Sequence, residues 1–239
     1  MRTNVSAGIR VLGVTAEGDR VVTAGLNHGE HPEVVIGKGG WSVDAPETAE
    51  LGPDGALELT YAVSPLSGPP PAAREATRRD ADIAAGEVGE AHQRVGAYAM
   101  VHGAPGVLLT QFNSQTAIPG NWGLPGGGLD EGESPVDGVH REVWEETGQR
   151  IVLGSLVTVQ SQHWVGRAPS GAVEDFHAVR IVYRATCPEP TEIVIHDVGG
   201  TTSAARWVAQ DELGGLSMTA SWRDLTELYG SQRPPRPPR

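Results

Sequence analysis

Short apolar runs separated by turn residues dominate the first 66 positions of the chain. Runs that are rich in Val, Ile, Leu and Thr and bounded by Gly, Asp or Pro are typical of β-strands. We therefore predict a β-rich N-terminal region over residues 1–66. Its predicted strands are Ile9–Val14, Arg20–Ala24, Val34–Ile36 and Ala56–Val63.

A proline-rich segment, Ser64–Pro71, interrupts this pattern and is typical of an extended linker. The stretch after it, Ala72–Gln93, is rich in Ala, Glu and Arg and predicts a solvent-exposed helix. Gly86 and Gly89 weaken the second half of that helix, because glycine is a poor helix former. We assign residues 67–94 to this linker and helix.

Strand patterns and helix patterns are mixed over residues 95–230, and a proline-rich tail follows at 231–239. Elements mixed in this way predict a sheet covered by helices, which places the chain in the α/β class. The predicted strands are Val95–His102, Val107–Phe112, Ile151–Val159, Phe176–Ala185 and Arg206–Ala209, and the predicted helices are Pro135–Thr147 and Trp222–Tyr229.

Charge and composition narrow the class of function. The 30 acidic and 18 basic side chains give a net charge of −12, which argues against broad electrostatic binding to nucleic acid or to an anionic membrane. Every apolar run is far shorter than the roughly 20 residues of a membrane helix. The N-terminal residues lack the apolar core of a signal peptide, and the single cysteine, Cys187, cannot form an intramolecular disulfide. We therefore expect a cytoplasmic protein without a membrane partner.

Three glutamates share one face of the predicted helix Pro135–Thr147. At about 100° per residue, Glu142, Glu145 and Glu146 fall within an arc of roughly 100°. Like charges at these spacings destabilise a helix, and acids near its C-terminus oppose the helix dipole. A solvated face normally interleaves lysine with glutamate, whereas here only Arg141 is close enough to compensate. A hard divalent cation such as Mg²⁺ would offset the repulsion.

A run of three glycines, Gly126–Gly128, lies ahead of this helix. Backbone without side chains can approach an ion or a phosphate closely, although such a run is often only a turn. Ser134 suits the N-cap position and Pro135 the first helical position, so the loop is expected to lead directly onto the acidic helix.

The loop and the helix together match a known pattern. The Nudix box, G-x5-E-x7-R-E-U-x-E-E-x-G-U with U aliphatic, is matched by Gly127, Glu133, Arg141, Glu142, Val143, Glu145, Glu146 and Gly148. Only the last position departs, since Gln149 stands where an aliphatic residue is expected. From roughly Val95 to Leu228 the chain therefore resembles the Nudix hydrolase superfamily.

This resemblance implies a fold, a reaction and a set of residues. The fold is an α/β/α sandwich with a mixed sheet, here preceded by the β-rich N-terminal region. The reaction is hydrolysis of a diphosphate linkage in a nucleoside diphosphate joined to another group, with Mg²⁺ (or Mn²⁺) as cofactor. The resemblance assigns Glu145, Glu146 and the Gly127 carbonyl to the metal, and makes Glu142 a ligand or the base acting on water.

The resemblance implies two further roles. Arg141 joins the catalytic residues of the box and would pair with Glu133, holding the loop against the helix. Family members commonly draw one more carboxylate from outside the box, and Glu174, Asp175 and Asp197 are the candidates. For each of these three, the role of an ordinary loop acid stays open.

The histidines carry a weaker signal. His177 lies in a strand-like run, where a packed or hydrogen-bonded histidine is expected. His102, His140 and His163 are isolated in the sequence and show no metal-ligand spacing.

Two classes of function stay open. The first is an enzyme acting on a nucleotide-type small molecule, and the second is a Nudix fold that senses a nucleotide or binds a partner without turnover. The intact set of three box glutamates favours the enzyme, because a pure sensor would not need all of them. The sequence identifies neither the nucleotide nor the oligomeric state, and a homodimer stays open.

Overall fold

The computed structural model describes residues 2–5, 7–72, 78–84, 86–116, 118–167, 171–197 and 199–230. The predicted proline-rich tail at 231–239 lies outside the described residues. The chain divides into two compact units. Unit 1 consists of Met1–Gly96, Gly128–Pro135 and Leu156–Ile181, and unit 2 consists of Ala97–Gly127, Val136–Ser155 and Val182–Arg239.

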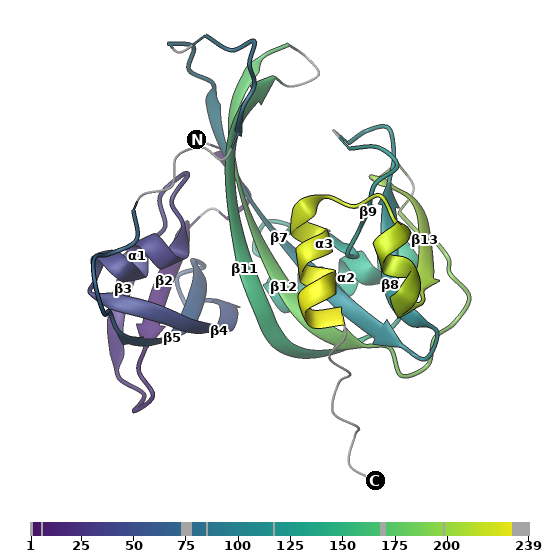
Figure 1. The fold of residues 1–239 in the computed structure, drawn as a ribbon, viewed down its shortest axis with the longest axis horizontal. Coiled ribbons are helices and arrows are strands. Elements are labelled where there is room, and N and C mark those ends of the chain that lie inside the picture. Colours follow the sequence, from purple (N-terminus) through teal and green to yellow (C-terminus); the bar gives the residue numbers. More distant parts are fainter. Residues whose placement is uncertain are drawn as a thin grey trace. The chain divides into compact units, whose positions relative to one another are not determined.

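Strands make up most of the regular structure (Figure 1). The strands are β1 (Arg2–Thr3), β2 (Ile9–Val14), β3 (Arg20–Gly25), β4 (Trp41–Leu51), β5 (Leu57–Pro65), β6 (Arg78–Arg79), β7 (Glu90–Gly103), β8 (Gly106–Phe112), β9 (Trp122–Gly123), β10 (Gly126–Gly128), β11 (Val152–Arg167), β12 (Val173–Thr186) and β13 (Thr202–Val208). The helices are α1 (Pro32–Lys38), α2 (Pro135–Thr147), the 3-10 helix η1 (Gln210–Gly215) and α3 (Ala220–Gly230).

The N-terminal region forms a four-stranded sheet in the order β3-β2-β5-β4, all of it in unit 1. Strands β2 and β5 run parallel, and β3 and β4 flank them in antiparallel orientation. Every second side chain of β5 is buried, as expected for a strand that packs one face: Leu57, Leu59, Tyr61 and Val63. Helix α1 packs against β2 and β4. The predicted β-rich character is confirmed.

One predicted strand of this region is wrong. Val34–Ile36 lies in helix α1, which begins at Pro32 and is capped by His31, whose Nδ1 accepts the backbone N–H of Glu33 at 3.3 Å. All three residues of the predicted strand are buried. Packing of this short helix therefore outweighs the strand preference of its β-branched side chains.

Strand β4 was not predicted, because a proline and several acids interrupt its apolar pattern. It is the edge strand of its sheet, and its pairing is irregular between Val43 and Ala45 and between Pro46 and Thr48. Proline is tolerated at sheet edges and bulges, where its missing N–H costs no ladder hydrogen bond.

The helix predicted over Ala72–Gln93 is absent from the described part of that stretch. Arg78–Arg79 form β6, which pairs in parallel with β11, and β7 begins at Glu90. A Cβ added to Gly89 would lie 2.8 Å from the backbone nitrogen of Asp175. Gly89 therefore allows close packing of two backbones, which a helical composition does not reveal.

The second sheet follows the order β13-β8-β7-β12-β11-β6, with β1 and β10 pairing to β7 and β9 pairing to β8. Strand β8 is antiparallel to β7 and β13, whereas β1 and β6 run parallel to their partners. The sheet is therefore mixed, as predicted. The long strands β7, β11 and β12 extend beyond their predicted bounds and contribute residues to both units.

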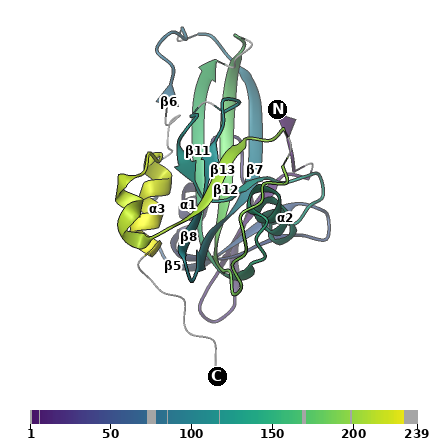
Figure 2. The same cartoon turned by 90° about the vertical axis from the view of Figure 1, so that its right-hand side faces the viewer.

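Two helices cover strands within unit 2. Figure 2 shows α2 and α3 on opposite sides of β8 and β13. Helix α2 has the predicted bounds and buries Val139 and Val143, whereas α3 buries Trp222 and Leu225. The Trp222 ring lies 5.0 Å from the ring of Tyr98 on β7. One helix on each face agrees with the predicted α/β/α sandwich. None of the described helices has the length and apolar character to cross a membrane.

The first residues of the chain are tied to β7 within unit 1. The Asn4 side-chain amide donates to the carbonyls of Val95 at 2.8 Å and Leu129 at 2.9 Å, and its oxygen accepts the Val95 N–H at 2.8 Å. Strand β1 pairs with β7 at His92. These contacts join the N-terminal region to the later part of the chain, and the predicted domain boundaries at 66 and 94 stay predictions.

Candidate active site

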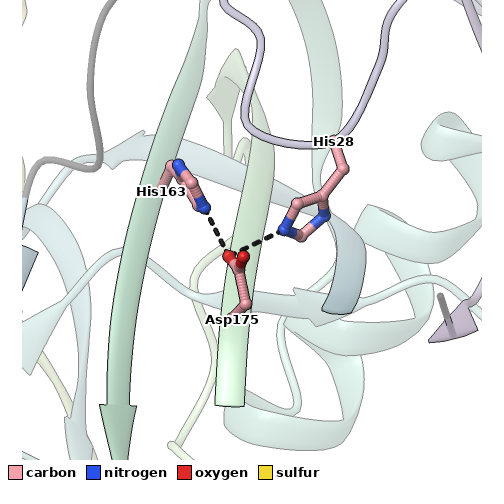
Figure 3. Close-up of side chains that lie close together, drawn as sticks. All are labelled: His28, His163 and Asp175. Atoms are coloured by element: carbon pink, nitrogen blue, oxygen red, sulfur yellow. Dashed lines mark hydrogen bonds and ion pairs between the residues drawn. The ribbon is translucent and has the colours of Figure 1, made fainter. Parts of the chain in front are cut away.

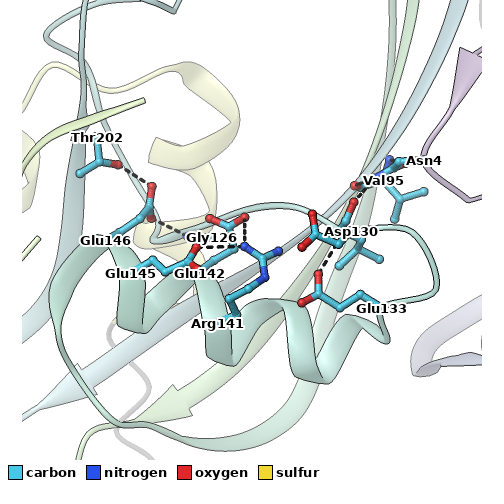
Figure 4. A network of polar contacts seen from close by, with 11 residues as sticks. Asn4, Val95, Gly126, Asp130, Glu133, Arg141, Glu142, Glu145, Glu146 and Thr202 are labelled. Atoms are coloured by element: carbon cyan, nitrogen blue, oxygen red, sulfur yellow. Dashed lines mark hydrogen bonds and ion pairs between the residues drawn. The ribbon is translucent and has the colours of Figure 1, made fainter. Parts of the chain in front are cut away.

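Helix α2 brings the three box glutamates and Arg141 together (Figure 4). The Arg141 Nη1 donates to Glu142 at 2.9 Å and to Glu145 at 3.0 Å. Glu145 is the most exposed of the three carboxylates, Glu142 is largely covered and Glu146 is buried. One guanidinium therefore serves two carboxylates, and the third lies deeper, against the glycine loop.

Glu146 is held by two neutral donors. The backbone N–H of Gly126 donates to Oε2 at 2.9 Å, and the Thr202 hydroxyl donates to Oε1. The pKa of Glu146 is raised to about 8, chiefly by burial and further by the charges of Glu142 and Asp197, against the lowering effect of the two hydrogen bonds. With protein groups alone around it, this carboxylate is costly to ionise, and a nearby cation would favour its charged form.

Glu142 has a related environment. Burial raises its pKa above the usual range, Arg141 opposes this, and the charges of Glu145 and Asp197 add to the rise. A carboxylate of this kind is a better proton acceptor near neutral pH than an exposed glutamate.

The glycine loop lies directly against these carboxylates. A Cβ added to Gly127 would lie 2.6 Å from both carboxylate oxygens of Glu142, and one added to Gly126 would lie 2.3 Å from the Ala97 carbonyl oxygen. Gly126 also has φ +138°, which L side chains rarely adopt. Only glycine therefore allows the loop backbone to approach Glu142 this closely.

Asp197 is the candidate extra carboxylate that lies beside α2. Its backbone N–H donates to the Glu145 carbonyl at 3.0 Å, and the N–H of His196 donates to the same oxygen at 2.7 Å. The charge of Asp197 contributes to the raised pKa values of Glu142 and Glu146. The segment that follows β12 thus adds a fourth carboxylate to this face.

The other two candidates, Glu174 and Asp175, lie in unit 1 and contact histidines there. Glu174 lies 4.0 Å from the His92 ring, and Asp175 contacts the rings of His28 and His163. Nothing in these contacts links either residue to the box glutamates.

Glu133 lies in unit 1, where its carboxylate accepts the backbone N–H of Asp130 at 2.9 Å. This hydrogen bond closes the turn before α2. Arg141 belongs to unit 2, so the predicted pair of Glu133 and Arg141 stays a prediction.

Gln149, the one departure from the box, is buried at the end of α2, and both polar atoms of its side chain are hydrogen-bonded. Its amide nitrogen donates to the Thr147 carbonyl at 3.2 Å and to the Thr191 hydroxyl at 3.1 Å, and its oxygen accepts the Thr191 N–H at 2.9 Å. A polar side chain therefore replaces aliphatic packing by tying the helix end to the segment after β12.

Sequence reasoning missed Thr202 and the N–H of Gly126 as partners of Glu146. Thr202 is 56 residues away, on β13, and belongs to no recognisable motif. The predicted packed role of His177 is confirmed, since its ring is fully buried and hydrogen-bonded at both nitrogens, to Gln93 and Ser161.

Comparisons with known proteins bear on this site. The nucleoside triphosphatase NudI of Salmonella heidelberg (strain SL476) is 24% identical over 126 residues, which cover 52% of this chain and 86% of that protein. The crystal structure of the MutT protein from Methanosarcina mazei Go1 has a TM-score of 0.45 and 24% identity, covering 57% of this chain and 91% of that chain.

A third comparison is the NUDIX domain of Shewanella oneidensis NrtR, solved in complex with ADP ribose. The match has a TM-score of 0.44 and 23% identity, and it covers 56% of this chain and 84% of that domain's chain. The NUDIX domain family model matches residues 92–228, which is more than half of the chain and includes the glycine loop, α2 and Asp197. The chain therefore belongs to the NUDIX domain family.

Proposed function

We propose that the acidic face of α2 and the glycine loop bind Mg²⁺ (or Mn²⁺), and that the chain hydrolyses a diphosphate linkage in a nucleoside diphosphate joined to another group. As a Nudix hydrolase it is an enzyme acting on pyrophosphate bonds of nucleotide-type compounds. The observation that carries the finer proposal is the arrangement of three carboxylates, one of them buried, beneath a backbone loop with no room for a side chain.

The donor set suits a hard divalent cation. Carboxylate and carbonyl oxygens are the ligands that Mg²⁺ prefers. Arg141 compensates part of the charge of Glu142 and Glu145, whereas both hydrogen-bond donors to Glu146 are uncharged. We assign the ion to Glu145, Glu146 and the Gly127 carbonyl, with Glu142 beside them as the base acting on water. A divalent ion bound there polarises a phosphoryl oxygen and lowers the pKa of a bound water.

The side chains of the site would divide the remaining work. Glu142, with its raised pKa, would accept the proton of the attacking water. Arg141 would hold Glu142 and Glu145 in fixed positions through its shared donor nitrogen. Asp197 is favoured as the extra carboxylate over Glu174 and Asp175, because its charge acts on the box glutamates.

The substrate class is tested most directly with a panel of nucleotides. The name of the NudI relative supports including nucleoside triphosphates, beside nucleotide sugars and dinucleotides. We expect turnover with Mg²⁺ and none with chelator. Glu142→Gln should lower the rate by roughly 10²–10⁴-fold while ligand binding is retained, because the amide keeps the shape of glutamate but accepts no proton.

The matched control is Asp137→Asn, which removes a charge from the exposed first turn of the same helix. It should keep the wild-type rate. Nucleotide binding without any difference in turnover between wild type and Glu142→Gln would contradict the proposal and favour the sensing or interaction module. A rate that chelator does not change would contradict the metal assignment.

A further inference from the structure

Two histidines and an aspartate that are far apart in the sequence converge in unit 1 (Figure 3). His28 lies in the loop between β3 and α1, His163 on β11 and Asp175 on β12. Their ligand atoms all lie within 4.8 Å of one another. The His28 Nε2 is 2.9 Å from Asp175 Oδ1, and the His163 Nε2 contacts the same oxygen.

We propose that His28, His163 and Asp175 form a binding site for a transition-metal cation of the zinc class. Two imidazole nitrogens and one carboxylate oxygen are a donor set that Zn²⁺ uses, with a fourth position left for water or another ligand. Mg²⁺ and Ca²⁺ prefer oxygen ligands throughout. This histidine cluster would therefore select a different metal from the acidic face of α2.

The three ligand atoms of the histidine cluster are close enough together for one ion to reach all of them. Ligand atoms about 2.0–2.2 Å from Zn²⁺ lie roughly 3.3–3.6 Å from one another, so both histidine nitrogens must move away from Asp175 Oδ1, by up to about 1 Å, to admit the ion. The His28 Nδ1 is buried and has no hydrogen-bond partner among the described residues. Within the described part of the chain, His28 therefore makes its polar contact through Nε2, which faces the other two ligand atoms.

The loop that carries His28 is shaped to let the two rings meet. Gly29 has φ +74°, and a Cβ there would lie 2.8 Å from the His163 Nδ1. A side chain at position 29 would therefore be strained and would push the His163 ring away. The next residue, Glu30, accepts a hydrogen bond from the Ser161 hydroxyl at 2.9 Å, which ties the loop to β11.

A buried histidine behind the cluster fixes this arrangement. Ser161 uses its hydroxyl hydrogen on Glu30, so it accepts from His177 Nε2 at 2.8 Å, and His177 Nδ1 accepts from the Gln93 amide at 2.9 Å. His177 is thus neutral and positions Ser161 and the loop.

The histidine cluster is open to solvent only in part. The side chains of the three residues are 17%, 20% and 27% exposed, for His28, His163 and Asp175. An ion can therefore reach the cluster while most of the surrounding water is excluded. Once bound, it would link the loop to β11 and β12 and add stability.

The test is a Zn²⁺ titration of the full chain by calorimetry, after chelator treatment and in excess Mg²⁺ that occupies oxygen-rich sites. We expect one Zn²⁺ per chain in the wild type. His28→Gln and Asp175→Asn should each weaken binding at least about 100-fold, since loss of an outer partner alone costs 10–100-fold. The matched control is His92→Gln, a histidine of unit 1 that contacts Glu90 and Glu174 instead.

A second measurement needs no variant. Co²⁺ added to the wild type should give the visible absorption of a tetrahedral site, and Zn²⁺ but not Mg²⁺ should displace it. The proposal is overturned if the wild type shows neither this spectrum nor Zn²⁺ binding. It is also overturned if folded His28→Gln and Asp175→Asn proteins, checked by circular dichroism, bind Zn²⁺ as tightly as the His92→Gln control.

Discussion

Replacing Glu146 with glutamine should stabilise the protein when divalent ions are removed. Glu146 is buried, and its pKa is raised from an ordinary value of 4.5 to about 8, chiefly by burial. A carboxyl group whose pKa rises on folding contributes its stability fully below pH 4.5 and loses it as pH rises through about 8. Above that pH the folded protein carries a buried charge that the unfolded chain exposes to water.

The magnitude follows from the pKa. The pKa rises from 4.5 to about 8, and each pH unit is worth about 1.4 kcal/mol. Ionising Glu146 therefore lowers the free energy of unfolding by roughly 5 kcal/mol above pH 8 and by about 3 kcal/mol at pH 7. Glutamine removes this cost and keeps the hydrogen bonds, because its oxygen can accept from Gly126 and its amide can face the Thr202 hydroxyl. Relaxation of the site would make the measured gain smaller.

The assay is urea unfolding with chelator at pH 5, 7 and 8.5, on the wild type, Glu146→Gln and the control Asp137→Asn. The free energies of unfolding of wild type and Glu146→Gln should be similar at pH 5 and separate as pH rises, with the variant more stable. Asp137→Asn removes a favourable charge from the first turn of α2, so it should differ from the wild type by only about 0.3–1 kcal/mol, with no change over this pH range. A Glu146→Gln protein that is less stable than the wild type at pH 8.5, or a difference that does not change with pH, would show that burying the Glu146 charge does not destabilise the fold.

Two further substitutions test the surroundings of the acidic face. Gly127→Ala places a methyl group 2.6 Å from the Glu142 carboxylate oxygens, so the loop or Glu142 must move. Steady-state kinetics should show at least a 10-fold loss of rate, and an unchanged rate would contradict the close approach of the loop to Glu142. Gln149→Leu restores the aliphatic residue of the box but leaves the Thr191 N–H without its acceptor. Urea unfolding should show that the free energy of unfolding falls by about 1–3 kcal/mol. A neutral or stabilising effect would contradict the role given to the Gln149 amide.

The parts of the site that depend on local spacing could be predicted from the sequence. Helix α2 has the predicted bounds, and the helical period correctly places Glu142, Glu145 and Glu146 on one face. The glycine loop before it was expected to approach an ion or a phosphate; the structure shows Gly127 close to the Glu142 carboxylate, and the approach to an ion stays a prediction. These features lie within some 20 consecutive residues, where the spacing of residues along the sequence alone decides which side chains share a helix face.

Features that depend on long-range packing could not be predicted. The helix expected over Ala72–Gln93 is wrong for the described residues, because composition is a weak guide where strand pairing decides the conformation. Treating His163 as isolated is also wrong, since His28 and Asp175 meet it only after β11 and β12 pair and the loop after β3 folds over them. Thr202 reaches Glu146 through β13 for the same reason.

Hydrolysis should depend on the ion that the acidic face of α2 binds. The most direct test is a Mn²⁺ titration followed by electron paramagnetic resonance, with the hydrolysis rate measured in the same samples. The rate should rise in proportion to bound Mn²⁺; Glu145→Gln should lose both together, and Asp137→Asn should keep both. Hydrolysis that persists after Mn²⁺ and other divalent ions are removed, or Glu145→Gln protein that binds Mn²⁺ and turns over like the wild type, would contradict this dependence on the ion.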